Sequence, residues 1–391
     1  MKKIICVTVV LFAFVLNAFE AKVVITRALN AEEQFAHILP HRPPFFPMLS
    51  KVEKNAPFSV YFVFIKPELK EGRAKISGKI TLHNADGTKK ESVLPVSVFN
   101  VKGEKAGVLL LPQSLKVCME APPADKYGKY TVALELTDEN SGKKAVHQAS
   151  FEYVEKLEID PKVKPLEKMT EYYRDPQPQY LFAAFRELMT LQDKQKAKEK
   201  RNYNPLPQLS LFYFVLKHNP QYIDAFADMV IKELKGSEQK LGAVVLCALR
   251  PEKRKEFPEK LAKGLEKNFS KNPFEIDKAV VPWHLDVLWS EFFVTGKRGS
   301  VLKILSAAKL AEKSLNINEF KKIKNPTKAD KQRLMNFLTS YAVYWSANSL
   351  VKKHELLRYY LECAFERKEL SDRFSTALAA KILSEHADLK K

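Results

Sequence analysis

The sequence predicts an antiparallel β-sandwich followed by an all-α domain of helical-hairpin repeats, similar to an α-solenoid. Three observations support this class. Apolar residues alternate with a period of two between residues 22 and 155, and they recur every three or four residues between 179 and 391. A proline-bearing stretch from 156 to 178 separates the two patterns and is expected to be a linker. The chain of 391 residues is also longer than one ordinary core requires.

Residues 1 to 21 have the composition of a secretory signal peptide. Two lysines precede an apolar run at residues 4 to 16, and small residues follow it. This run is shorter than the roughly 20 residues that a membrane-spanning helix needs. We therefore expect an exported protein, periplasmic or extracellular, without a transmembrane segment in the mature chain. Its mature chain should begin at Phe19 or Lys22.

The formal charge of +19 is unevenly distributed along the chain. Residues 22 to 155 hold 19 Lys and Arg against 15 Asp and Glu, whereas residues 156 to 391 hold 44 against 30. Outside the cytoplasm, such a surface favours an acidic protein or an envelope polyanion as partner, and we expect no nucleic acid partner. A solvated Lys-rich surface without any partner is the alternative.

The first domain is predicted from short segments rich in Val, Ile, Phe and Thr. Turn signals such as the Asn-Ala-Asp-Gly at residues 84 to 87 separate them. Strands at this spacing are typical of an antiparallel sandwich. The expected strands are residues 58 to 65, 74 to 84, 91 to 99, 106 to 111, 130 to 136 and 145 to 154.

The segment ADKYGKYTVALEL, residues 124 to 136, contains Asp125, Gly128 and Tyr130. This pattern resembles the start of strand F in immunoglobulin-like domains, with one additional residue in the spacing. The resemblance implies that Tyr130 is a corner tyrosine whose hydroxyl bonds to backbone upstream. It also implies a member without the inter-sheet disulfide, because Val132 occupies the position of the cysteine.

The second domain is predicted to contain about ten helices, since each segment places apolar residues three or four apart. The expected helices are residues 180 to 192, 208 to 218, 222 to 234, 240 to 250, 257 to 268, 284 to 296, 300 to 315, 333 to 353, 355 to 368 and 374 to 386.

The stretch WSEFFVTGKRGSVLKIL, residues 289 to 305, contains a Gly-Lys pair but not a phosphate loop. A Walker motif requires a glycine where Glu291 stands and a Ser or Thr where Arg298 stands. We expect Gly296 to end one helix in a left-handed conformation and Ser300 to cap the next.

A related turn occurs three times, and in each a Ser precedes a Lys by seven residues. The Ser residues are Ser210, Ser290 and Ser346, and the cationic or imidazole pairs are Lys217 with His218, Lys297 with Arg298, and Lys353 with His354. If the hairpins stack, these six residues form one anion-binding edge. The alternative is that each Lys or Arg only complements the dipole of its own helix end.

No metal or cofactor site is predicted. The loop that begins at Asp138 lacks the acidic positions of a calcium loop, and Pro40 prevents a helix that would align His37 with His41. After cleavage of the signal peptide three cysteines remain: Cys118, Cys247 and Cys363. We expect buried thiols, with a Cys247–Cys363 bridge as the alternative.

Binding is favoured over catalysis, because the chain contains no recognised catalytic motif. The segment HELLR at residues 354 to 358 lacks the second His of a zinc protease. His284 and Asp286 beside Trp283 form the strongest local cluster, which a helix start also explains. We predict an exported, non-enzymatic binding or scaffold protein of the cell envelope. The alternative is a glycosidase-like enzyme that combines a sandwich with an α/α helical domain.

Overall fold

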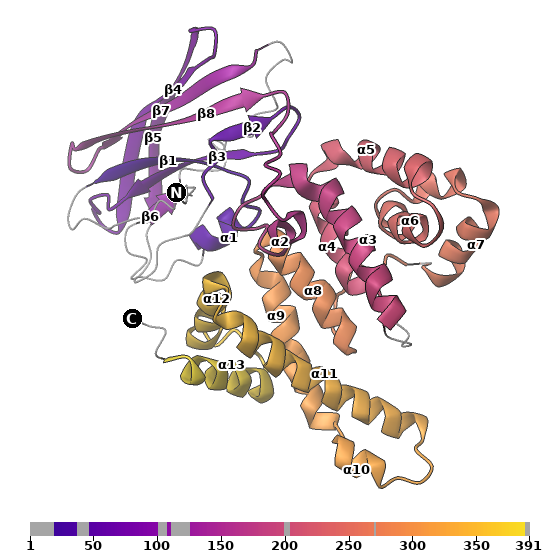
Figure 1. The fold of residues 1–391 in the computed structure, drawn as a ribbon. Helices are drawn as coiled ribbons and strands as arrows, with labels where there is room; N and C mark the ends of the chain where they lie inside the picture. Colours follow the sequence, from indigo (N-terminus) through magenta and orange to yellow (C-terminus); the bar gives the residue numbers. More distant parts are fainter. Residues whose placement is uncertain are drawn as a thin grey trace. The chain divides into compact units, whose positions relative to one another are not determined.

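The computed structural model describes residues 19 to 36, 47 to 100, 108 to 110, 126 to 198, 204 to 269 and 271 to 387. The chain divides into two compact units, Met1–Asp160 and Pro161–Lys391 (Figure 1). The first unit consists mainly of strands and the second of helices. Most of the predicted signal peptide lies outside the described residues, as do His37, His41 and Cys118.

The first unit contains two sheets. The smaller sheet has the order β1-β3-β6, with β1 (Glu20–Thr26), β3 (Ser59–Ile65) and β6 (Val108–Leu110). The larger sheet has the order β2-β8-β7-β4-β5, with β2 (Lys51–Glu53), β8 (Lys144–Val154), β7 (Gly128–Asp138), β4 (Arg73–His83) and β5 (Lys89–Asn100). All neighbouring pairs are antiparallel except β2 with β8.

Strand β1 was not predicted, and it includes residues 20 and 21, which the sequence analysis assigned to the signal peptide. Alternating apolar residues continue directly from the leader into the strand, so composition alone does not separate them. Phe19 is buried just before β1. A mature chain that begins at Phe19 keeps the whole strand, whereas one that begins at Lys22 loses two of its residues.

The two sheets share one hydrophobic core. Every second residue of β7 from Tyr130 to Leu136 is buried, as the period of two predicts. The Tyr130 ring stacks on Phe151 of β8 at 5.4 Å between centroids. Its hydroxyl donates a hydrogen bond to the carbonyl of Lys126 at 2.7 Å. This is the upstream backbone contact expected of Tyr130.

On its other face, the smaller sheet packs against the short helix α1 (Ala31–Ala36), where Ala31 joins Val24, Tyr61, Val63 and Ile65 in a second cluster.

The helical unit begins within the predicted linker. Helix α2 (Pro165–Thr170) forms there, and Met169, Tyr172 and Tyr173 are buried. The stretch from 161 to 178 is therefore largely part of the folded unit. Prolines suggested a linker, but Pro165 occupies the first position of α2, where a missing N–H costs nothing.

The remaining helices follow in chain order. They are α3 (Leu181–Lys198), α4 (Leu206–Lys217), α5 (Ile223–Asp228), α6 (Gly236–Leu249), α7 (Glu259–Asn268), α8 (Pro282–Thr295), α9 (Arg298–Ser306), α10 (Ile317–Lys321), α11 (Lys328–Val351), α12 (Glu355–Glu366) and α13 (Arg373–Glu385). A π-helical turn, Met229–Glu233, extends α5, and a 3₁₀ segment, Ala307–Lys313, extends α9.

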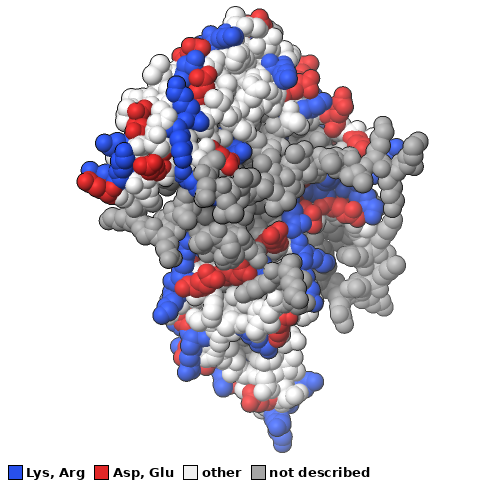
Figure 2. Space-filling model, turned by 90° about the vertical axis from the view of Figure 1, so that its left-hand side faces the viewer, with Lys and Arg blue, Asp and Glu red and all other residues white. Residues whose placement is uncertain are grey.

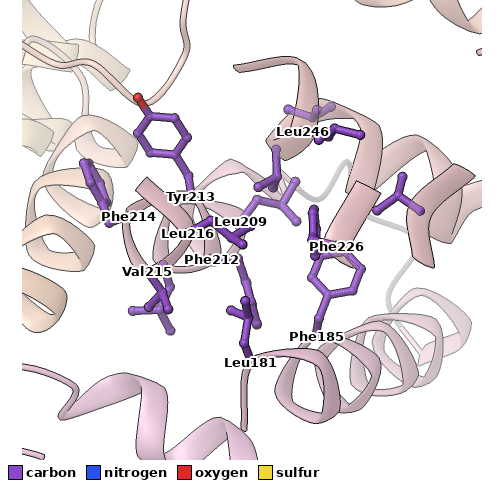
Figure 3. Close-up of a cluster of buried hydrophobic side chains, with 14 of the residues drawn as sticks. Leu181, Phe185, Leu209, Phe212, Tyr213, Phe214, Val215, Leu216, Phe226 and Leu246 are labelled. Carbon is purple, nitrogen blue, oxygen red and sulfur yellow. The ribbon is translucent and has the colours of Figure 1, made fainter. Parts of the chain in front are cut away.

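Helix α4 is central to this unit, because residues 209 to 216 are all buried. Figure 3 shows its side chains pointing to opposite sides of the helix, toward neighbours on α3, α5 and α6. The Phe212 ring meets Phe185 edge-on at 5.1 Å, and Phe185 in turn meets Phe226 at 5.3 Å. A helix surrounded in this way needs apolar residues all round.

The turn between α8 and α9 confirms one prediction and corrects another. Gly296 has a φ of 62°, and its N–H donates to the carbonyl of Phe292 at 2.7 Å, so it ends α8 as expected. Ser300 is not the cap of α9, because the helix already begins at Arg298. Its buried hydroxyl instead donates to Glu291 at 2.9 Å and ties α9 back to α8.

Cys247 and Cys363 are buried, reduced thiols. Burial raises the pKa of both, so that neither is poised as a thiolate.

Two glycines of the same turn should respond oppositely to alanine. Gly296→Ala introduces a Cβ at positive φ and should lower the free energy of unfolding by about 1 to 2 kcal/mol. Gly299 lies in the first turn of α9 with open space around its Cα. Gly299→Ala should therefore be neutral or stabilise by up to about 1 kcal/mol. Urea denaturation of both variants measures the difference, and equal effects would contradict the assigned backbone.

Candidate functional site

The three predicted turns lie at the C-terminal ends of α4, α8 and α11. The recurring Ser residues lie where these helices meet. Ser290 of α8 donates to the carbonyl of Pro207 in α4 at 3.2 Å, and Ser346 of α11 accepts from the indole N–H of Trp289 in α8 at 3.0 Å. Small hydroxyl residues allow such close approach. The recurrence therefore marks positions of helix packing.

One segment, residues 172 to 174, contacts all three turns. Asn219, just after α4, donates to the hydroxyl of Tyr172 at 2.8 Å. The N–H of Tyr173 donates to the carbonyl of Phe293 in the last turn of α8 at 2.9 Å. Two of the three helix ends are thus fixed by neighbouring residues of one short segment.

The third helix end is held by the same segment. Arg174 donates to the carbonyl of Lys353 at 2.6 Å, and the hydroxyl of Tyr173 lies 3.1 Å from Nδ1 of His354. This segment was not predicted to be functional or structured, because it falls within the stretch expected to be a linker. Two adjacent tyrosines in an otherwise charged stretch were the available signal, since linkers seldom carry large aromatic side chains.

Two of the four predicted cations already have acidic partners. Lys217 lies 3.1 Å from a carboxylate oxygen of Glu275 and over the ring of Tyr213. Arg298 is buried and forms an ion pair with Glu369. A buried, paired guanidinium is a structural element, because a ligand anion would have to displace the carboxylate.

His218 is half-buried and lies near Lys297, although 79 positions separate them in the chain. Burial lowers the pKa of His218 to about 4, and the charges of Lys297 and Lys217 act in the same direction. His218 is therefore neutral near pH 7 and adds no positive charge to the edge.

His354 is buried at the start of α12, with its ring 5.0 Å from that of Phe293. Burial, together with the nearby charges of Arg174 and Lys353, lowers its pKa to about 4. Like His218, it is neutral near pH 7.

The structure thus brings the three turns together but leaves few cations available at them. Among the residues that the structure describes, Lys297 and Lys353 have no acidic side chain within ion-pair distance, and only Lys353 is fully exposed. The six residues form mainly a structural junction.

A second group of cations was missed by sequence analysis. Residues 313 to 333, which comprise α10 and the start of α11, form a helical hairpin with seven Lys and Arg against two acidic residues. The cations are all exposed and are Lys313, Lys321, Lys322, Lys324, Lys328, Lys331 and Arg333. We call this segment the α10–α11 hairpin. Figure 1 shows it extending away from the other helices of the unit.

Both acidic residues of the hairpin are occupied by capping. Glu319 forms a capping box with Asn316 at the start of α10, and Asp330 forms one with Thr327 at the start of α11. Hydrogen bonds from Thr327 lower the pKa of Asp330. Each carboxylate satisfies backbone donors of its helix, so neither is directed at a lysine.

The remaining candidate clusters have local roles. His284 accepts a hydrogen bond from the N–H of Val280 at 3.3 Å at the start of α8, and partial desolvation raises the pKa of the Asp286 carboxyl to about 6. Asp224 and Asp228, which lie four residues apart on α5, are both exposed, and Asp228 forms an ion pair with Lys232. None of these arrangements places two carboxylates opposite one another.

Beside α6 and α7 lies a small cavity of about 130 Å³. Its lining is apolar and cationic, with Arg254 and Lys271 beside Cys247 and without a carboxylate. It does not supply the acid pair of a glycosidase.

Asp138 accepts hydrogen bonds from the N–H groups of Glu68 and Asn140 and from the hydroxyl of Ser141. The carboxylate therefore closes the turn between β7 and β8. In the described part of the chain, His, Cys, Asp and Glu residues form no group of three or more that could hold a metal ion. A search of the same residues finds no helix with the length and apolar character that crossing a bilayer requires.

Because His218 and His354 are neutral in the folded protein, we expect the protein to lose stability in mild acid. Below about pH 6.5 the unfolded chain binds a proton at each position, whereas the folded chain does so only near pH 4. The free energy of unfolding should therefore fall as the pH drops from 6.5 to 4, on the order of 1 to 3 kcal/mol for each histidine.

Urea denaturation across this range should show a shallower decline for His218→Gln and His354→Gln than for the wild type. Superimposable pH profiles of the wild type and both variants would contradict the role assigned to these histidines.

Comparison with known proteins provides no family assignment: no protein-family model matches the chain, and no curated protein is significantly similar to it.

Proposed function

We propose that the protein is an exported, non-enzymatic binding or scaffold protein of the cell envelope, with the helical unit as its interaction surface. The observation that carries this proposal is the exposed charge of the α10–α11 hairpin, whose two acidic residues are both used as helix caps. Several like charges on one projection add their fields and attract an acidic protein or an envelope polyanion.

On the one face that Figure 2 shows, the charges outside the hairpin are mixed. Figure 2 shows basic and acidic side chains interspersed over most of the described face, with basic side chains at the lower tip, where Figure 1 places the α10–α11 hairpin. Mixed charges are typical of a solvated surface, so the hairpin is the better candidate for a binding element.

Within this proposal, the sheet unit is an immunoglobulin-like sandwich. The shared core of the two sheets and the hydrogen bond from Tyr130 to Lys126 support this class. The parallel pairing of β2 with β8 is an addition at the edge of the larger sheet.

The helical unit is proposed to be an irregular array of helical hairpins. Helices α4, α8 and α11 lie side by side and point the same way, since both their Ser contacts and their C-terminal turns meet. Equivalent helices of successive repeats pack in this manner. The intervals of 80 and 56 residues between the recurring Ser residues give the array its irregularity.

Export is proposed from the composition of residues 1 to 21. Expression of the whole chain in a bacterial host, followed by fractionation and N-terminal sequencing, tests it. We expect a chain in the envelope fraction that begins at Phe19. A chain that keeps Met1 and stays in the cytoplasm would refute this part of the proposal.

Charge reversal tests the role of the hairpin. Lys321→Glu, Lys322→Glu and Lys324→Glu together should weaken retention on envelope fractions about tenfold or more, because three attractive charges become repulsive. The matched control reverses Lys89, Lys90 and Lys129 of the sheet unit, which are equally exposed. The difference should shrink at high salt, as the Debye length falls from about 10 Å at 0.1 M to about 3 Å at 1 M.

Equal losses of envelope retention in both triple variants would show that only the net charge of the protein matters, and would contradict the proposal. Release of reducing sugars from a panel of polysaccharides by the wild type would instead favour the glycosidase-like alternative.

A further inference from the structure

Helix α11 carries a second apolar line on the side opposite its core contacts. Its buried residues are Asn336, Thr339, Val343, Ala347 and Val351, which follow one side of the helix. Leu334, Leu338, Tyr341 and Trp345 are spaced four, three and four residues apart and therefore follow the opposite side. We call these four residues the α11 seam.

The seam exposes unusually large apolar side chains. Trp345 is 65% exposed and Tyr341 is 59% exposed, while Leu334 and Leu338 are half-buried. The ring of Phe337 stacks on that of Tyr341 at 6.2 Å and 12°, which limits the orientations of Tyr341. Exposed aromatic rings along one line typically mark a surface that a partner covers.

The seam has cations at both ends. Lys331 continues its spacing toward the N-terminus and Lys352 continues it toward the C-terminus, and both are exposed. The 21 positions that separate them correspond to roughly 30 Å of helix. Arg333 lies beside the first of these ends and belongs to the α10–α11 hairpin, so the seam and the cationic hairpin form one continuous surface.

We propose that the α11 seam docks an amphipathic helix with acidic flanks, presented by a partner protein. The alternation of three and four residues is the spacing by which two helices interlock side chains. The terminal cations select a partner with Glu or Asp beside its apolar positions. This inference rests on the proposed binding function and names the class of partner.

A second copy of the chain does not fit the seam. In an antiparallel pair, Lys331 of one copy would meet Lys352 of the other, and in a parallel pair each lysine would meet its equivalent. Both arrangements bring like charges together. An anionic lipid surface fits less well, because interfacial helices present a broad apolar face and the seam is only two positions wide.

The test uses the full chain and two designed helical peptides of about four heptads. Both carry Leu at the core positions and no Trp, and they differ only in having Glu or Lys at the flanking positions. Fluorescence anisotropy of labelled peptide measures affinity, and a blue shift of tryptophan emission reports burial of Trp345. We expect saturable binding of the Glu peptide, at least about tenfold tighter than that of the Lys peptide.

Two variants locate the binding. Tyr341→Ser with Trp345→Ser should weaken binding of the Glu peptide about tenfold or more, whereas Val93→Ser with Val96→Ser, at 80% and 57% exposed positions of β5, should leave it unchanged. Lys331→Glu with Arg333→Glu should reverse the preference toward the Lys peptide, and Lys89→Glu with Lys90→Glu should not. All the substituted side chains are exposed, so circular dichroism should show that each variant keeps its fold.

Several results would overturn the proposal. These are equal binding of both peptides, unchanged binding by the seam variant, concentration-dependent dimers that the seam variant abolishes, or a blue shift with phosphatidylglycerol vesicles in the absence of peptide binding. Failure here is distinguishable from failure of the proposed function. A wild type that is exported and retained in the envelope but binds the Glu and Lys peptides equally refutes only the docking helix, whereas a wild type that stays in the cytoplasm refutes the function while peptide binding persists.

Discussion

The arrangement of the helical unit depends on the hydrogen bonds that residues 172 to 174 make with three helix ends. The last carbonyl groups of a helix have no partner within it. Here the N–H of Tyr173 and the guanidinium of Arg174 satisfy carbonyls at the ends of α8 and α11, and Arg174 also complements the helix dipole. With Tyr172 bonded to Asn219, one segment sets the relative positions of α4, α8 and α11.

This junction explains why charged residues at the turns do not form an open anion site. His218 and His354 are neutral because burial and neighbouring cations both oppose protonation. Lys217 and Arg298 are neutralised by Glu275 and Glu369. A larger group of exposed cations lies instead on the α10–α11 hairpin, where helix capping occupies both acidic residues.

Much of the fold could be predicted because its signals are local. The alternation of apolar residues predicted β7 and its buried face, and a short motif predicted the hydrogen bond from the Tyr130 hydroxyl to backbone upstream. The turn at Gly296 was predictable from one glycine. The junction was not, because the contact of Tyr173 with His354 spans 181 positions. The hairpin charge was visible in the sequence, but only the capping geometry shows that its acidic residues are occupied.

If the protein binds an acidic helix along α11, photo-crosslinking from this helix in the native host should capture the partner. A photoreactive phenylalanine placed at Trp345 should yield a discrete protein adduct with an acidic amphipathic segment at the crosslinked site. The same residue placed at Val93 should not, and Lys331→Glu with Arg333→Glu should remove the adduct. Equal crosslinking at both positions, or adducts only with lipid, would show that α11 does not bind an acidic protein partner.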